Sequence, residues 1–138
     1  MKYFFIILSL LLTGKDCSQK KENENVLSFE YSAVSRGFSK HIKINDKAIT
    51  VQNSILKKAC PQNDWNRLVE LSKTIPVETI ASLEAPSKKR FFDGAAIANL
   101  TLFYNDSIYK TPSFDHGNPP AEIAELVKEI LSISENIE

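Results

Sequence analysis

Residues 91–133 read FFDGAAIANLTLFYNDSIYKTPSFDHGNPPAEIAELVKEILSI, and this stretch predicts two strands followed by a helix. Segments 95–104 and 107–114 are rich in β-branched and aromatic residues. The Asn-Asp pair at 105–106 joins them and tolerates the backbone angles of a tight turn. Within residues 120–132 the apolar side chains recur at three- and four-residue intervals, which is typical of an amphipathic helix. Because an isolated hairpin is only marginally stable, we expect the helix to cover a larger sheet that contains the hairpin.

The segment that precedes this stretch supplies the rest of that sheet. Residues 26–52 contain three runs of alternating apolar and polar residues separated by short turns, a pattern that predicts an antiparallel meander. Residues 61–75 follow a helical period, with Trp65 on the apolar face, where we expect it to be part of the core. A further helical turn is expected over 77–83, whereas 53–60 shows no clear period. Together these patterns predict an α+β fold, an antiparallel sheet of four to five strands with two main helices packed on one face.

The chain divides into three parts by composition. Residues 1–18 have a short positive start and an apolar run at 3–12, which is too short to span a bilayer and is typical of a signal peptide. Residues 19–25 are polar without an apolar period and predict a flexible tether. Residues 26–138 are expected to form a single α+β domain. We therefore expect an exported protein of the periplasm or the outer membrane.

Cys17 is the candidate lipidation site, because the end of the signal is similar to that of a bacterial lipoprotein. In such signals a small residue directly precedes the modified cysteine, but here Lys15 and Asp16 separate Gly14 from Cys17. The alternative is ordinary cleavage near Gly14, which would leave Cys17 as a thiol. In that case Cys17 and Cys60 could form a disulfide in an oxidising compartment. If Cys17 is lipidated, Cys60 is a structural residue or a free thiol.

The composition and the loops offer little for catalysis. The 17 basic and 17 acidic residues balance, so no basic face for nucleic acid is implied. Asp93, Asp115 and His116 are the only clustered loop groups that suggest chemistry, and three such residues are too few for a metal site. Ser87 or Ser113 could be placed with His116 in a triad, but no nucleophile elbow or glycine-lined oxyanion pocket accompanies them. We expect no cofactor, no metal and no enzymatic activity, with Asp115 accepting backbone hydrogen bonds that shape its loop.

The order of elements resembles that of emfourin-like domains. The match rests on a strand ending in Ser35-Arg36-Gly37-Phe38, a Trp-bearing helix, a hairpin, Phe114-Asp115 and a terminal helix started by proline. The family has Ser-Gly-Gly-Phe at the first of these motifs. Its founding members inhibit thermolysin-type metalloproteases, so the resemblance implies an inhibitor-like fold. The signal end and the loop at 114–120 resemble small lipoproteins of Bacteroidetes-type bacteria.

These observations predict a non-catalytic binding module tethered to a membrane through a lipid on Cys17. The expected partner is a protein such as a protease, and the candidate interaction surface consists of Arg36, Gly37, Phe38, Asp115 and His116. Two alternatives stay open. One is a small envelope enzyme that uses Asp93, Asp115 and His116, and the other is a structural envelope lipoprotein without a soluble ligand.

Overall fold

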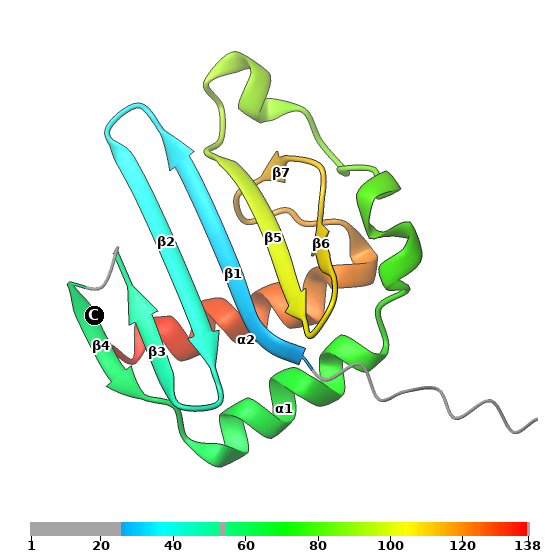
Figure 1. Cartoon of the computed structure of the whole chain (residues 1–138). Coiled ribbons are helices and arrows are strands. Elements are labelled where there is room, and N and C mark those ends of the chain that lie inside the picture. Colours follow the sequence, from blue (N-terminus) through cyan, green and yellow to red (C-terminus); the bar gives the residue numbers. More distant parts are fainter. Residues whose placement is uncertain (1–25, 53–54, 138) are drawn as a thin grey trace, which may run out of the picture.

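A computed structural model of the chain describes residues 26–52 and 55–137. The predicted signal peptide, Cys17 and the predicted tether lie outside the described residues. The described part contains one antiparallel sheet with helices behind it (Figure 1). The strands are β1 (Val26–Ser35), β2 (Phe38–Asn45), β3 (Ala48–Val51), β4 (Leu56–Ala59), β5 (Ile97–Tyr104), β6 (Ile108–Lys110) and β7 (Phe114–Asp115).

The α+β class and the antiparallel sheet are confirmed, but the sheet has seven strands instead of four to five. The order is β4-β3-β2-β1-β5-β6, and β7 also pairs with β5. One extra strand is β4, which pairs with β3 from a segment that shows no clear period in the sequence. The other arises because the predicted strand at 107–114 is split into β6 and β7. Pro112 lies between these two and has no N–H to donate to a ladder.

Two helices cover one face of the sheet (Figure 1). Helix α1 (Gln62–Lys73) and helix α2 (Ala124–Glu135) contact each other, and α2 also contacts β2 and β3. A 3₁₀ turn (Ala121–Ile123) precedes α2, so the α-helix begins later than the prolines at 119–120 predict. Two further 3₁₀ turns are η1 (Val77–Ser82) and η2 (Lys89–Phe92). The expected short helical turn over 77–83 is therefore confirmed as η1.

The core lies between the sheet and these helices. Trp65 is 9% exposed, and its ring centroid lies 5.6 Å from that of Phe29, so its expected place in the core is confirmed. Removing such large aromatic and aliphatic side chains from water is the main favourable term in folding. The fully buried large side chains on the strands, on the 3₁₀ turn before α2 and on α2 include Phe29, Tyr31, Ile42, Ile44, Leu100, Leu102, Phe114, Ile123, Leu126 and Ile130.

Candidate functional site

The tip of the β1–β2 hairpin carries three residues of the predicted interaction surface. Arg36, Gly37 and Phe38 are all exposed. Gly37 has a φ of +79°, a left-handed conformation that glycine adopts without strain, and open space surrounds it. Ser35 and Phe38 are opposite each other in the ladder, so the turn is tight and holds Arg36 at the end of the sheet.

His116, which is distant in sequence, packs against Phe38 at this turn. Its ring centroid is 5.4 Å from that of Phe38 and 6.0 Å from that of Tyr31. The Tyr31 hydroxyl and His116 Nδ1 share a hydrogen bond of 2.7 Å. We use the name "tip surface" for Arg36, Gly37, Phe38 and His116. The structure therefore brings together four of the five residues predicted for this surface.

The ionisation of the two hydrogen-bonded groups is shifted by their surroundings. Burial lowers the pKa of His116, and the positive charge of Lys40 lowers it further. Burial also raises the pKa of Tyr31, so its hydroxyl keeps its proton. At neutral pH the pair is therefore an uncharged imidazole and an uncharged phenol, suited to packing and hydrogen bonding.

Asp115 does not belong to the tip surface, because its side chain is only 2% exposed. Successive strand residues point to opposite faces, so Phe114 and His116 lie on the core side while Asp115 points the other way. There its carboxylate accepts four hydrogen bonds and forms an ion pair with Arg90. The donors are Ser87 Oγ (2.5 Å), the Lys89 and Arg90 backbone N–H groups (2.9 and 3.0 Å) and the Arg90 guanidinium (3.0 Å).

We call this arrangement of Asp115 with Ser87, Lys89 and Arg90 the Asp115 cradle. Burial acts to raise the pKa of Asp115, but the Ser87 hydroxyl and the Arg90 and Lys89 groups together hold it well below its ordinary value of 3.8. The Arg90 guanidinium also donates to Ser87 O (2.7 Å) and Ser113 Oγ (3.1 Å). The predicted role of Asp115 as an acceptor of backbone hydrogen bonds is thus confirmed, and all of its bonds serve structure.

The groups considered for catalysis do not converge. Asp93 is an exposed residue with a φ of +55° that ends η2. Asp115 and His116 are adjacent but have different partners on opposite faces. The Ser87 hydroxyl donates to Asp115, and the Ser113 hydroxyl accepts from Arg90. Both hydroxyls thus bond to groups other than His116, whose imidazole is hydrogen-bonded to Tyr31.

Cys60 is a half-buried thiol at the start of α1. A cysteine at a helix start can have a stabilised thiolate. Here burial raises the pKa of Cys60, and the carboxylates of Asp64 and Asp46 raise it further. The protonated thiol is therefore favoured at this position.

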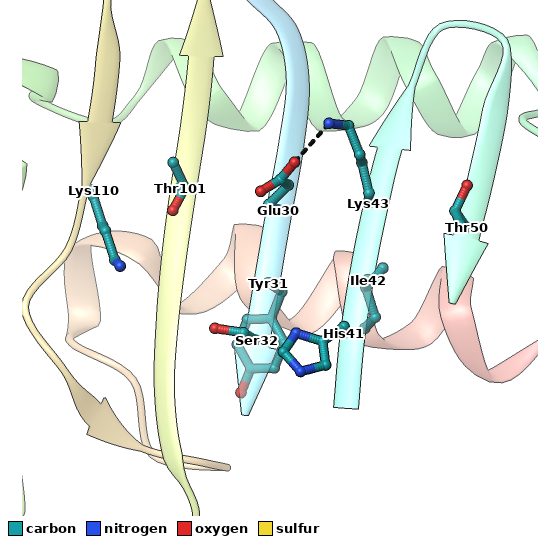
Figure 2. A pocket seen from close by; sticks show the side chains of 9 residues that line it. All are labelled: Glu30, Tyr31, Ser32, His41, Ile42, Lys43, Thr50, Thr101 and Lys110. Carbon is teal, nitrogen blue, oxygen red and sulfur yellow. Dashed lines mark ion pairs between the residues drawn. The ribbon is translucent and has the colours of Figure 1, made fainter. Parts of the chain in front are cut away.

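The face of the sheet opposite the helices holds a polar groove, none of whose lining residues is among those predicted for a site (Figure 2). The groove has a volume of about 390 Å³. Lys43 forms a 2.7 Å ion pair with Glu30 on the neighbouring strand, and its ammonium lies 5.4 Å from the centroid of the Phe103 ring. The alternation of the strands could have indicated this polar face. Its lining residues are Glu30, Tyr31, Ser32, His41, Ile42, Lys43, Thr50, Thr101 and Lys110.

A second hollow of about 440 Å³ lies where the start of α1 meets the end of α2. Among residues 26–52 and 55–137, no group of three or more His, Cys, Asp or Glu side chains is placed to hold a metal ion. No helix in the same part of the chain is both long and apolar enough to cross a bilayer.

No family model, no curated protein and no solved structure matches this chain significantly.

Proposed function

We propose that this protein is an exported lipoprotein, held to a membrane by a lipid on Cys17, whose domain is a non-catalytic module that binds a protein partner. The observation that carries the proposal is the tip surface. Arg36 and Phe38 are exposed on a tight turn, and His116 supports Phe38 from below. Aromatic and arginine side chains on a preorganised surface are the residues that most often dominate protein binding.

Tyr31 connects this surface to the core. Its side chain is 1% exposed, and its hydroxyl holds His116 through the 2.7 Å hydrogen bond. Phe38 and His116 are thus held in place before a partner arrives, which reduces the entropy lost on binding. This support is what a binding surface needs, and it requires no proton transfer.

The partner class follows from the resemblance to emfourin-like domains, which implies inhibition of a thermolysin-type metalloprotease. The test is the hydrolysis of a peptide substrate by thermolysin in the presence of increasing amounts of the purified protein. We expect inhibition that Arg36→Glu weakens and that Lys128→Glu, an exposed change on α2, leaves unaltered. No effect at micromolar protein would remove the inhibitor part of the proposal.

The anchor is tested separately from the binding. Mass spectrometry of the mature N-terminus should show a lipid-modified Cys17, and Cys17→Ser should release the protein from the membrane fraction. Cys60→Ser is the matched control and should leave the protein in that fraction. An unmodified thiol at Cys17 in the mature protein would contradict the anchor.

The two alternative functions have less support from the geometry. An enzyme that uses Asp93, Asp115 and His116 would need side chains within hydrogen-bond reach of one another. Asp115 instead serves the cradle, and His116 lies on the opposite face of the strand. A structural lipoprotein without a soluble ligand would be distinguished by a pull-down from solubilised membranes that recovers only other envelope components.

A further inference from the structure

Residues 88–93, which we call the aromatic loop, present two adjacent phenylalanines to solvent. Phe91 is 63% exposed and Phe92 is 84% exposed, although phenylalanine is among the residues most often buried. Both belong to η2, in which the Phe91 N–H donates to Lys88 O (3.1 Å) and the Gly94 N–H donates to Lys89 O (2.9 Å). The two rings therefore project from an ordered turn.

Hydrogen bonds from the Asp115 cradle fix the position of this turn. The carboxylate binds the backbone N–H groups of Lys89 and Arg90, directly before the two phenylalanines. The Arg90 side chain is only 7% exposed, and its guanidinium carbon lies 4.3 Å from the centroid of the Phe91 ring. A buried ion pair thus supports an exposed apolar pair, so little conformational freedom is lost when the loop meets a surface.

Other apolar and basic side chains lie at the same end of the sheet. Val34 and Ile97 are ladder partners, 43% and 48% exposed, on the face opposite the helices. Ile97 also pairs with Asp115, which places this apolar pair beside the cradle. Lys88 and Lys89 are exposed and precede the phenylalanines in the loop, and Asp93 is the one exposed carboxylate within residues 88–93.

We propose that the aromatic loop inserts into the surface of an anionic membrane. Phe91 and Phe92 would enter the boundary between headgroups and acyl chains, and Lys88 and Lys89 would contact the anionic headgroups. A membrane suits this loop better than a protein partner for two reasons. Lysine is depleted in protein interfaces, and neither of the two hollows described above is lined by a residue of this exposed loop. The contact is independent of the tip surface and of the lipid on Cys17.

The test uses a fluorophore at the loop itself, so that the N-terminal apolar run cannot produce the signal. Phe92→Trp is made in the full chain, with the buried Trp65 as a constant background. Ile108→Trp is the matched control, because Ile108 is 66% exposed and pairs with Phe103, at the end of β5 opposite Ile97. The vesicles contain phosphatidylglycerol with brominated phosphatidylcholine, or brominated phosphatidylcholine alone.

We expect the Phe92→Trp emission to shift to the blue and to be quenched by the phosphatidylglycerol vesicles, while the Ile108→Trp emission stays unchanged. Adding Lys88→Gln and Lys89→Gln should weaken vesicle binding by roughly 30-fold, because each lysine near an anionic surface contributes on the order of a fivefold gain in affinity. Circular dichroism of each variant confirms that it is folded.

Three results would overturn the proposal. The first is the absence of a shift with either vesicle; a shift on adding a soluble acidic peptide would then assign the loop to a protein partner. The second is equal quenching of both tryptophan variants. The third is a blue shift without vesicles that grows with protein concentration, which would mean that the loop binds a second copy of the chain.

Discussion

The segment at 114–116 has two sides with opposite properties. On the side facing away from the helices, Asp115 is ionised, 2% exposed and saturated with hydrogen bonds from residues 87–90. On the core side, the pKa of His116 is lowered, and its ring lies between Tyr31 and the exposed Phe38. The difference teaches that an Asp-His pair in sequence is no evidence of an Asp-His pair in space, because strand residues alternate between faces.

The largest effect on the free energy of unfolding is expected from a substitution of Phe114, the buried residue that directly precedes Asp115 and His116. Phe114 is 0% exposed, and its ring centroid lies 6.2 Å from that of Tyr31. Phe114→Ala should lower the free energy of unfolding by about 3–5 kcal/mol, because it removes buried apolar surface and leaves a cavity. Urea unfolding followed by circular dichroism measures this. A loss no larger than that of an exposed substitution would show that the segment is not fixed by its core residue.

The second largest effect on the free energy of unfolding is expected from Asp115→Asn, on the side of the segment that faces away from the helices. The folded state holds the pKa of Asp115 below its unfolded value of about 3.8, so the stabilisation is full above that pH and is lost as pH falls towards the lower, folded pKa. Asp115→Asn should therefore be destabilising at pH 7. It should also lose less stability than the wild type between about pH 5 and pH 2. Urea unfolding at several pH values tests both points.

The matched control for Asp115→Asn is Glu30→Gln. Glu30 pairs with Lys43 across the open face, but its side chain is 38% exposed. Removing such a solvent-exposed pair should change the free energy of unfolding by about 1 kcal/mol or less. If Glu30→Gln were as destabilising as Asp115→Asn at pH 7, burial would not be what distinguishes the cradle.

On the core side, Tyr31→Phe should produce a smaller loss. The ring and its packing are retained, and only the hydrogen bond to His116 is removed, which is worth about 1 kcal/mol. The same substitution should weaken protease binding, since His116 supports Phe38 at the tip surface. Urea unfolding and the thermolysin assay measure the two effects. An unchanged stability would mean that the hydrogen bond adds nothing to the support of the tip surface.

The smallest effect concerns charge alone. Burial first and Lys40 second lower the pKa of His116, so Lys40→Gln should raise that pKa towards 6.5. Because the folded pKa lies below the unfolded one, His116 stabilises the fold fully above pH 6.5 and less as pH falls below it. Lys40→Gln should reduce this loss of stability at low pH. A ¹H-¹⁵N NMR titration of the imidazole checks the pKa, and added salt should imitate the substitution in the wild type.

The alternation of apolar and polar residues within 26–52 predicted the strands β1, β2 and β3, and helical spacing predicted α1 and α2. The sequence could also predict that Asp115 accepts backbone hydrogen bonds. It could not predict the donors, which lie 25 and 26 residues earlier in the chain. Likewise, Tyr31 and His116 are 85 residues apart, and only the pairing of β1 with β5 and of β5 with β7 brings them together.

The exposed phenylalanines were missed for a related reason. Residues 88–90 are a short basic run, which in sequence alone is typical of a solvated loop. Nothing local in the sequence indicates that Arg90 turns inward to Asp115 while Phe91 and Phe92 are exposed. Strand β4 was missed because its residues are all exposed and therefore lack the apolar alternation on which strand prediction depends.

Strand β1 has a consequence for orientation. It enters the sheet at Val26 and ends beside the aromatic loop, so its ten residues separate the two by roughly 33 Å. A domain attached to one bilayer both by a lipid ahead of Val26 and by the phenylalanines would have to recline, with β1 running along the plane of the lipid headgroups. A domain attached by the lipid alone could stand upright and carry Arg36 far out from the bilayer.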